Sequence, residues 1–583
     1  MALRLASLSV GFLALCLAAG CGGDDSGGSG QSLPDAGLPD ASTSDASDAG
    51  ADSTPDDGAP DDGSTNPDAT PDATADAGSP CTKSPAECAL EDEQAASDQL
   101  DLVKGDPVEL RKFLAAVPKG GDLHNHLSGA VYAETYLDWA KTEGGYCITN
   151  SSLSLSTSCS NTSTTSPVPV PADALFMQVV RAWSMQDFVA GAETGHDHFF
   201  ATFGKFGAIS GPAHHAKGLA DVMKRADSEN ALYVEPMLFS NSNASNWGSA
   251  VWTGGTLTTA ALPTFHAALL ASSGYGAAVQ AILTDIQNTD SGAQSILGCK
   301  SASPDSACRV GARYMVYISR SGSGPGIFAQ MVAAFEAAKT EPRLVALNLV
   351  GPEDGSTALS SYDRSMEMLG YLHTAYAGKS PLHVTLHAGE ITQKYLPSGY
   401  VISNIDHIRK AVQVAKAERI GHGVDVLNES NPSALLAELK QLGVMIEIGL
   451  SSNIQILEVS GTAHPLAAYL QSGVPVALAT DDQGVSRSSM AGEYARAVED
   501  QKLDYKTLKL MARTSLEKSF LPGASLWTSL GTLQAIAACA PTATGYFGDT
   551  PAPVACQAEL ASSAKATAQW ELERRFREFE SKQ

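Results

Sequence analysis

Positive charge and aromatic side chains are both scarce in this chain. Of its 583 residues, 38 are Lys or Arg against 64 Asp or Glu, and 7% are aromatic. A formal net charge of −26 with no basic stripe is the opposite of what the nucleic-acid backbone attracts, so nucleic acid is excluded as a partner. Glycine and proline are frequent but not periodic, which excludes a collagen-like architecture. The 43% apolar content is enough for a large globular core.

Several short signatures of nucleotide and metal chemistry are missing as well. The chain has no G-x-x-x-x-G-K-[ST] segment, which excludes a P-loop for phosphates. It has no H-x-E…P-C-x-x-C signature, which excludes the zinc site of the cytidine deaminase fold. The C-x-x-C spacing typical of thiolate zinc sites is absent too.

Apolar runs of transmembrane length are lacking, and the most apolar stretch lies at the N-terminus. Residues 5–19 are too short to span a bilayer but have the size of the apolar region of a secretory signal. The segment Leu17-Ala18-Ala19-Gly20-Cys21 resembles the lipobox of bacterial lipoproteins, which implies cleavage before Cys21 and lipidation of its thiol. We therefore expect a lipoprotein-type signal peptide over residues 1–20, export, and anchoring to a cell-envelope membrane through Cys21. The alternative is a secreted protein with an ordinary cleaved signal and an incidental cysteine.

The next sixty residues have the composition of a linker. Residues 22–80 contain fourteen Asp and no Lys or Arg, and most of the others are Ala, Gly, Ser, Thr or Pro. Such a segment has too little apolar surface to offset the entropy of ordering, and its like charges repel one another. We predict a disordered linker over residues 21–80, starting at the lipidated Cys21, and one domain over residues 81–583.

Eight cysteines remain beyond Cys16 and Cys21. They form four pairs close together in sequence: Cys81/Cys88, Cys147/Cys159, Cys299/Cys308 and Cys539/Cys556. An even number of cysteines in an exported chain indicates disulfides, although the sequence alone does not choose among the connectivities. Local pairing is our hypothesis, because each pair brackets a loop-like stretch.

From about Leu100 onward, short apolar runs alternate with segments of helical spacing. Eight runs are predicted as buried strands: 121–126, 232–237, 314–319, 344–350, 382–387, 419–422, 444–448 and 474–480. Segments of helical spacing include 405–416, 432–442, 464–471 and the charged tail 564–582. The alternation predicts an α/β fold with a parallel sheet. Two polar stretches that each hold a cysteine pair, near 141–174 and 291–311, are interpreted as surface insertions.

Two short blocks place histidines at the ends of predicted strands. In H-N-H, His124 and His126 are two residues apart, so in an extended strand they project to the same side and can bind one ion. In H-A-G-E, His387 ends a strand, and the following turn brings Glu390 back toward the same mouth. His383 shares the face of His387 but lies a layer deeper, so we interpret it as a hydrogen-bonded interior residue and not as a ligand.

Two further blocks end later strands. R-I-G-H-G sets His422 between two glycines, and T-D-D places Asp481 and Asp482 after an apolar run. Adjacent carboxylates point opposite ways in an extended chain. Asp481 can therefore bind a metal while Asp482 faces another part of the pocket.

Taken in this order, the four blocks resemble the motifs of the adenosine deaminase family of zinc hydrolases. Further matches are L-V-G-P-E at 349–353, S-N at 452–453, H-P at 464–465 and S-L-E-K-S-F-L at 515–521, so the resemblance spans roughly residues 118–521. It implies a (β/α)₈ TIM-type barrel with its site at the C-terminal mouth of the strands. It also implies one Zn²⁺ per chain, bound by the histidines and carboxylate at His124, His126, His387 and Asp481. Such a set leaves a position for water, whose pKa the ion lowers toward about 7.

The same resemblance implies roles for four other residues. Glu390 would be the protonated acid that hydrogen-bonds purine N1, and His422 would orient and stabilise the attacking hydroxide. Asp482 would hydrogen-bond N7, and the backbone N–H of Gly351 would face N3. An acid is needed because the amidine carbon is a poor electrophile until N1 is protonated, and burial can keep a carboxyl group protonated near neutral pH. We expect an enzyme that deaminates adenosine, and deoxyadenosine, to inosine plus ammonia outside the cytoplasm.

One residue departs from the family pattern. The purine deaminases of this family commonly carry Asp two residues after H-x-H, where it binds the ribose 5′-hydroxyl, and here that position is Ser128. A serine hydroxyl can bind a 5′-hydroxyl but does not repel phosphate. The alternative substrate is therefore another aminopurine, such as a nucleotide or an N6-substituted adenine. A third hypothesis is a surface purine-binding or signalling module with incidental catalysis, and the sequence does not indicate an oligomeric state.

Other histidines resemble metal motifs without the right geometry. On a helix, His196 and His198 diverge by about 200°, so they cannot share an ion. The adjacent His214 and His215 have a similar defect, and His407 belongs to an apolar helical pattern. We interpret all five as structural or surface residues.

Overall fold

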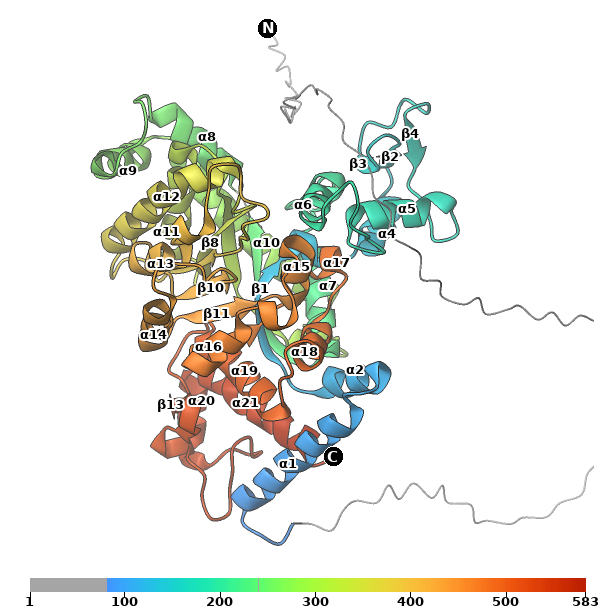
Figure 1. Ribbon diagram of the computed structural model, residues 1–583, viewed down its shortest axis with the longest axis vertical. Coiled ribbons are helices and arrows are strands. Elements are labelled where there is room, and N and C mark those ends of the chain that lie inside the picture. The colour runs from blue at the N-terminus through green and yellow to red at the C-terminus, as the bar shows by residue number, and fades with distance from the viewer. Residues whose placement is uncertain (1–80, 240) are drawn as a thin grey trace, which may run out of the picture. The chain divides into compact units, whose positions relative to one another are not determined.

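The computed structural model describes residues 81–239 and 241–583 (Figure 1). The chain divides into two units, Met1–Gly78 and Ser79–Gln583, and the described residues belong to the second. The predicted signal peptide, Cys21 and the predicted linker lie outside the described residues. Among the described helices, none alone has the length and apolar composition to cross a membrane, whereas the pair Thr259–Ala271 and Tyr275–Ile296, bent by 78°, meets both criteria.

Eight parallel strands form a barrel at the centre of this unit (Figure 1). In barrel order they are β1 (Gly120–His126), β5 (Ala231–Phe239), β7 (Tyr314–Ser319), β8 (Leu344–Val350), β9 (His383–Ala388), β10 (Arg419–His422), β11 (Met445–Ile448) and β12 (Val476–Leu478). The chain after β12 returns to β1 through a bridge between Asn125 and Asp481. There the Asp481 N–H donates to the His124 carbonyl at 2.9 Å and the His126 N–H donates to the Asp481 carbonyl at 3.0 Å. The (β/α)₈ prediction is confirmed, and all eight predicted strands are present with ends shifted by no more than two residues.

Helices cover the outside of this barrel. They are α7 (His215–Ser228), α8 (Ser242–Val251), α9 (Leu262–Ala271), α10 (Tyr275–Ile296), α11 (Gly324–Ala338), α12 (Ser356–Ala375), α13 (His407–Gln413), α14 (Pro432–Leu442), α15 (Leu450–Leu457), α16 (Leu466–Ser472), α17 (Gln483–Ser486), α18 (Met490–Glu499) and α19 (Tyr505–Lys518). Because both faces of each strand are then covered, strands such as β8, Leu-Val-Ala-Leu-Asn-Leu-Val, are almost continuously apolar. Short 3₁₀ turns lie at Thr259–Ala261, Ser306–Arg309, Ile402–Asn404, Gly461–Ala463, Leu530–Thr532 and Ala537–Cys539, and the short strand β6 (Gly311–Ala312) pairs with β5.

The ends of the helices follow from local sequence. At α14 the Asn431 side chain accepts a hydrogen bond from the Ala434 N–H, and Pro432 occupies the first turn, where no N–H is needed. Gly443 ends the helix at φ +68°, a conformation that glycine adopts without strain. The predicted helix 432–442 is confirmed, and the predictions 405–416 and 464–471 correspond to the shorter α13 and α16.

A lobe inserted after β1 stands beside the barrel (Figure 1, teal). It consists of α3 (Leu127–Ala130), α4 (Ala133–Glu143), the antiparallel strands β2 (Cys147–Thr149), β3 (Ser154–Ser156) and β4 (Thr165–Pro167), α5 (Ala174–Trp183) and α6 (Gly195–Phe206). The lobe has an apolar core of its own, in which Tyr136, Ile148 and Trp183 are buried. The predicted insertion 141–174 forms its outer part, while α6 returns toward the barrel and packs against α15.

The second predicted insertion begins later than expected. Residues 291–296 continue α10, because Thr289 and Ala293 are buried and this helix packs against α7. The irregular segment is therefore shorter than the predicted 291–311.

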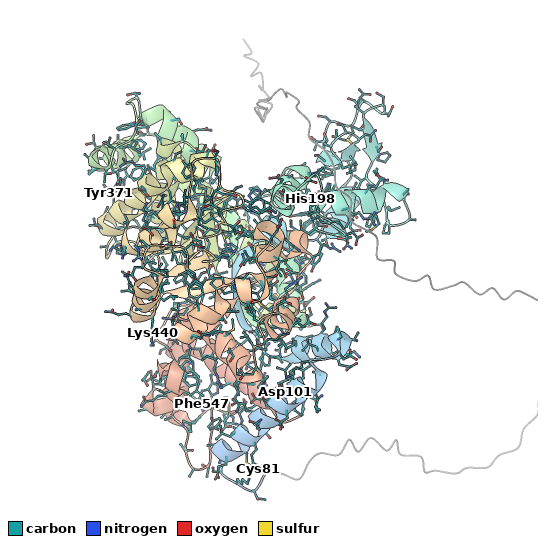
Figure 2. The ribbon with its side chains drawn as sticks, in the orientation of Figure 1. Cys81, Asp101, His198, Tyr371, Lys440 and Phe547 are labelled. Carbon is teal, nitrogen blue, oxygen red and sulfur yellow. A yellow bond between two sulfur atoms is a disulfide. The ribbon has the colours of Figure 1, made fainter. Side chains whose placement is uncertain are left out.

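All four predicted local cysteine pairs are disulfides. They are Cys81–Cys88, Cys147–Cys159, Cys299–Cys308 and Cys539–Cys556. Figure 2 marks Cys81 at the start of the described chain.

The two ends of the unit pack against each other below the barrel. These elements are α1 (Pro85–Val103), α2 (Pro107–Ala116), β13 (Trp527–Ser529), β14 (Gln534–Ala535), α20 (Val554–Ser562) and α21 (Ala564–Glu580). The predicted charged helix 564–582 corresponds to α21, and it packs against α1 and α19. Buried ion pairs hold it to α19, with Arg513 Nε 2.7 Å from Glu573 and Lys509 Nζ 2.6 Å from Glu580.

Candidate active site

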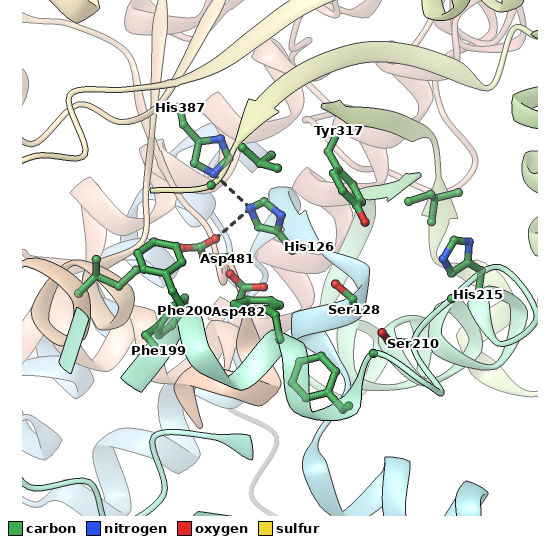
Figure 3. A pocket seen from close by; sticks show the side chains of 18 of the residues that line it. His126, Ser128, Phe199, Phe200, Ser210, His215, Tyr317, His387, Asp481 and Asp482 are labelled. Carbon is green, nitrogen blue, oxygen red and sulfur yellow. Dashed lines mark hydrogen bonds and ion pairs between the residues drawn. The ribbon is translucent and has the colours of Figure 1, made fainter. Parts of the chain in front are cut away.

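Four side chains from β1, β9 and the end of β12 converge at the C-terminal mouth of the barrel. His387 Nε2 lies 3.1 Å from His124 Nε2 and 3.2 Å from His126 Nε2. Asp481 Oδ1 lies 3.3 Å from His126 Nε2 (Figure 3). It also lies 3.5 Å from His124 Nε2. The structure therefore brings together the four residues that the sequence predicts as metal ligands.

The spacing of these four atoms fits a tetrahedral metal ion. A zinc ion with ligands at 2.0–2.1 Å places neighbouring ligand atoms about 3.3 Å apart. Burial lowers the pKa of His126 to about 3 and that of His387 well below its ordinary value, so both imidazoles are neutral and offer a lone pair. Burial also acts on His124, but hydrogen bonds to Asp481 and Glu447 outweigh it and raise its pKa to about 10. A metal ion would displace the proton held there.

A buried chain of charges orients His124. Its Nδ1 donates to Glu447 Oε2 at 2.7 Å, which leaves Nε2 to face the other ligands. Glu447 also lies 2.6 Å from Arg419 Nε and accepts a hydrogen bond from the Thr385 hydroxyl at 3.0 Å. Arg419 in turn lies 2.7 Å from Glu235. Since all these groups are buried, the imidazole is held in one orientation.

His387 is held in the same way by an amide. Asn348 Oδ1, at the middle of β8, accepts hydrogen bonds from the His387 backbone N–H at 3.0 Å and from its Nδ1 at 2.9 Å. The His387 carbonyl accepts from Arg320 Nη2 at 2.9 Å. His387 Nε2 is thus left free to face His124 and His126.

Glu390 follows in the tight turn after β9, and its backbone is fixed by a second carboxylate. Glu353 accepts hydrogen bonds from the Gly389 and Glu390 N–H groups, both at 3.0 Å. Arg320, 3.4 Å away, and a hydrogen bond from His407 lower the pKa of Glu353 to about 2 against the effect of burial. For Glu390 the effect of burial prevails: together with the nearby charges of Asp481 and Glu353, it raises the pKa well above the ordinary value. Its surroundings therefore favour the protonated form of the Glu390 carboxyl group.

His422 and Asp482 complete the wall around the ligands. His422 Nε2 lies 3.5 Å from Glu390 Oε1 and 3.9 Å from Asp481 Oδ2, and burial lowers the pKa of this imidazole to about 4. Burial, and then the charge of Asp481, raise the pKa of Asp482 well above its ordinary value. The Asp482 carboxyl group lies so close to Gly129 that any Cβ there would be 1.7 Å from its Oδ1. Glycine at that position makes room for the acid.

Two of these residues have strained backbones. His422 has φ +68° and Asp481 has φ +57°, a left-handed conformation that costs a residue with a side chain roughly 1–3 kcal/mol. His422 is the last residue of β10, and Asp481 lies three residues after the end of β12. The bridge to β1 holds Asp481 in this conformation and turns its carboxylate toward the histidines.

These groups open onto a cavity of about 530 Å³ (Figure 3). His126, His387, Glu390, Asp481 and Asp482 line one side of it. Ser128 and Gly351, both predicted as substrate-binding residues, line it as well. The structure therefore places seven of the nine predicted site residues on the cavity, while His124 and His422 lie within contact distance of its wall.

The opposite side of the cavity consists of residues that sequence reasoning missed. The aromatic side chains of α6 cover it: Phe199, Phe200, Phe203 and Phe206. Tyr317, Ser210 and His215 line its far end (Figure 3). His215 Nδ1 donates to Asp285 at 3.0 Å, so this histidine is a buried member of the cavity wall and not a surface residue. No motif marks these positions in the sequence.

One predicted environment is wrong. His383 is not an interior residue, because it is the first residue of β9 and lies at the opposite rim of the barrel. Its side chain is 38% exposed, its Nδ1 donates to Glu418 at 2.8 Å, and its ring stacks on Phe520. The prediction that it is not a metal ligand agrees with this position.

Residues 280–526 match the family model described as Adenosine deaminase. The match covers less than half of the chain, including Gly351, Glu390 and Asp481 but not the strand that carries His124 and His126. The adenosine deaminase of Escherichia coli O1:K1 / APEC is 33% identical over 196 residues, which are 33% of this chain and 50% of that protein. The adenosine deaminase of Escherichia coli strain SE11 gives the same values. The chain thus spans half the length of these curated relatives.

Two solved deaminase structures align with most of the chain at low identity. Adenine deaminase from Arthrobacter aurescens is 15% identical, with a TM-score of 0.44, over 70% of this chain and 95% of that chain. The N6-mAMP deaminase of Arabidopsis is 19% identical, with a TM-score of 0.45, over 70% of this chain and 96% of that chain.

Proposed function

We propose that the chain is a member of the adenosine deaminase family and that it hydrolyses adenosine, and deoxyadenosine, to the corresponding inosine and ammonia with the help of one Zn²⁺. One observation carries this proposal. Three imidazole Nε2 atoms and Asp481 Oδ1 form one cluster, in which His387 lies 3.1 and 3.2 Å from the other two histidines and Asp481 lies 3.3 and 3.5 Å from them. Glu390, a buried acid with a raised pKa, lines the same cavity. Binding alone does not require such an acid.

The donor set suits zinc. Imidazole nitrogens with one carboxylate oxygen, in tetrahedral arrangement, are typical Zn²⁺ ligands, and catalytic zinc sites keep a further position open. When bound, zinc lowers the pKa of water so that a nucleophile is available near neutral pH. His124, His126, His387 and Asp481 would hold it.

Glu390 supplies the proton that the purine needs. The raised pKa of its buried carboxyl group keeps the proton in place until N1 of the base is within reach. Transfer of this proton to N1 makes C6 electrophilic, so that water adds there and the C6–N bond breaks. One proton of the water leaves with the amino group as ammonia, and the other restores the acid form of Glu390. Glu353 fixes the backbone of Glu390 and so aims its carboxyl group at the base.

Two further groups orient the purine. N7 is a hydrogen-bond acceptor, so its partner must donate, and the raised pKa of Asp482 favours the protonated form of that carboxyl group, which can donate. The Gly351 N–H supplies a donor for N3. A purine held at N1, N3 and N7 presents one face of C6 to the nucleophile.

The lining of the cavity favours a nucleoside over a nucleotide. None of the described residues that line it is Lys or Arg, while three of them are carboxylic acids: Glu390, Asp481 and Asp482. Phosphate groups are recognised chiefly by cationic side chains. The far end instead offers Ser128, Ser210 and Tyr317, whose hydroxyls suit an uncharged sugar.

Ultraviolet absorbance with purified zinc-loaded protein tests the proposal. We expect turnover of adenosine and deoxyadenosine and little turnover of AMP, N6-methyladenosine or adenine. Faster turnover of AMP or of N6-methyladenosine than of adenosine would identify that compound as the substrate and leave the proposed chemistry unchanged. Binding of adenosine with no turnover of any of the five compounds would contradict the enzyme and favour a purine-binding module.

We also propose that the reaction takes place outside the cytoplasm, on a protein anchored by a lipid on Cys21. The support is the resemblance of residues 17–21 to a lipobox and the acidic linker behind it. Expression of the full chain in bacteria supplied with labelled palmitate should label the wild type and not Cys21→Ala. Equal labelling of both, or release of the wild type into the medium, would contradict the anchor.

A further inference from the structure

A chain of buried hydrogen bonds runs away from the active site behind His422. His422 Nδ1 lies 2.9 Å from Asn453 Nδ2, and Asn453 Oδ1 lies 3.0 Å from His464 Nε2. His464 Nδ1 lies 3.1 Å from the backbone N of Leu466. The three side chains are at most 2% exposed. They sit at the end of β10, on α15, and just before α16.

The chemistry of its last member fixes the direction of every bond in this chain. The Leu466 N–H can only donate, so His464 Nδ1 must accept. Burial lowers the pKa of His464 to about 4, so the ring is neutral at neutral pH and its one proton is on Nε2. That N–H donates to Asn453 Oδ1 and excludes the flipped orientation of the amide. The Asn453 NH₂ group therefore donates to His422 Nδ1.

We propose that Asn453 and His464 are positioning residues that hold His422 in the tautomer with its proton on Nε2. His422 then serves as a hydrogen-bond donor to the attacking oxygen and cannot accept a proton from it. This assignment rests on the proposed function. Its structural support is that His422 Nε2 is buried, has no hydrogen-bond partner among the described residues, and lies between Glu390 and Asp481.

The assignment separates the duties of two neighbouring residues. A donor at His422 stabilises negative charge that develops on the oxygen as it adds to C6. Proton delivery then belongs to Glu390, the acid that lines the cavity. A neutral imidazole with the opposite tautomer would present a lone pair to the same oxygen and repel it.

The first test is a direct measurement of the tautomer that requires no turnover. In protein labelled with ¹⁵N-histidine, NMR correlations distinguish Nε2–H from Nδ1–H, and a His422→Ala sample identifies the signals of His422. We expect Nε2–H in the wild type and Nδ1–H in Asn453→Asp, whose carboxylate can only accept a hydrogen bond. Nδ1–H in the wild type would overturn the proposal even if adenosine is deaminated. If the wild type deaminates no purine, the proposed function fails while this result still decides the tautomer.

The second test is kinetic. A catalytic histidine held in the wrong tautomer loses about 10⁴-fold in kcat. We expect Asn453→Asp to lower kcat by about 10²- to 10⁴-fold with nearly unchanged KM and full metal content. The control Asn428→Asp makes the same chemical change at an exposed position after β10 and should leave kcat unchanged. A kcat of Asn453→Asp close to that of the wild type would overturn the proposal.

A double-mutant cycle shows whether Asn453 acts through His422. If it does, Asn453→Asp should have no further effect in a His422→Ala background, because the group it positions is gone. Equal and additive losses in the two backgrounds would overturn the proposal. This readout also separates positioning from a general loss of stability, which would act in both backgrounds.

His464 offers a matched pair of variants. His464→Gln keeps an N–H donor for Asn453, whereas His464→Phe removes it with little change in volume. We expect the Phe variant to lose kcat nearly as strongly as Asn453→Asp and the Gln variant to recover at least part of that loss. Equal activity of the two variants, with equal metal content and thermal stability, would show that the donor at residue 464 has no role.

Discussion

The two sides of the cavity are built in different ways. On the metal side, His124, His387 and Asp481 lie at the ends of barrel strands, are at most 4% exposed, and are held by buried hydrogen bonds and ion pairs. On the opposite side, α6 of the inserted lobe supplies phenylalanine rings, of which Phe200 and Phe203 are only half-buried. The barrel thus fixes the chemistry, and an insertion shapes the space for the rest of the substrate.

The difference predicts how each side responds to substitution. Removing one group on the metal side leaves its buried charged or polar partners without a hydrogen-bond or ion-pair partner. The loss of stability is then far larger than the contribution of the contact itself. Removing a ring on the α6 side loses apolar contact area, a smaller and more local loss. Effects should therefore fall from the metal ligands outward to α6.

The largest effects are expected at the ligands. Asp481→Ala and His126→Ala should each lose the metal and all measurable deaminase activity, because three remaining ligands hold zinc far less tightly than four. Metal analysis of purified protein checks this. Asp363→Ala, at an exposed carboxylate on α12, is the control and should retain one zinc per chain. Full zinc occupancy in both ligand variants would remove these residues from the metal site.

Glu390→Gln should keep the metal but lose turnover. The amide has nearly the same size and keeps the backbone hydrogen bonds to Glu353, but it cannot deliver a proton to N1. General acid catalysis contributes about 10²- to 10⁴-fold, so kcat should fall by that factor with zinc content unchanged. Turnover like that of the wild type would exclude Glu390 as the acid.

Glu447→Gln should have an intermediate effect, on the metal and not directly on the substrate. The amide weakens the support of His124 and leaves Arg419 with Glu235 as its remaining buried carboxylate. Loss of such support typically lowers metal affinity about 10- to 100-fold. Competition with a chelator measures this affinity. Zinc affinity equal to that of the wild type would show that Glu447 stabilises the barrel interior and does not support metal binding.

The two sides also differ in how far the sequence predicts them. The strands are predictable because apolar runs of this length are typical of strands that are covered on both faces. Three of the ligands lie in the last residues of such strands, and Asp481 follows soon after another. Glu447 interrupts the apolar run V-M-I-E-I. This charge predicts a buried partner nearby, because a buried carboxylate needs one. By contrast, the left-handed conformations of His422 and Asp481 arise from tertiary contacts and leave no mark in the local sequence.

The residues on the α6 side of the cavity cannot be predicted from sequence patterns. An apolar helix in an insertion has the same amphipathic pattern whether it packs on its own lobe or covers a cavity. Phe199 and Phe206 do both, because they are buried in the core of the lobe and also line the cavity. For His215, the buried partner Asp285 is seventy residues away in sequence, which no local pattern reveals.

A smaller effect is expected at Phe200. Phe200→Ala should raise KM for adenosine about 3- to 10-fold, because part of the apolar wall is lost, with kcat and zinc content nearly unchanged. Leu270→Ala, at an exposed position on α9, is the control. A loss of kcat with unchanged KM would mean that α6 acts on the chemical step and that the contrast between the two sides is wrong.

The smallest expected effect depends on pH and concerns the contact that holds α6 over the cavity. His196 on α6 lies 3.1 Å from Asp354, after β8, and its ring stacks on Tyr395, after β9. Burial lowers the pKa of His196, but hydrogen bonds to Asp354 and Asp197 outweigh it, so the pKa is raised above 6.5. A raised histidine pKa means that the ion pair is complete below pH 6.5 and is lost as the pH rises through the raised value. KM for adenosine should therefore increase on the alkaline side by roughly 2- to 3-fold, the scale of a partly exposed ion pair. His196→Gln and Asp354→Asn should each raise KM at pH 6 and remove this alkaline limb, because neither variant has an ion pair to lose. The same alkaline increase in both variants would assign it to another group and leave α6 held by its apolar contacts alone.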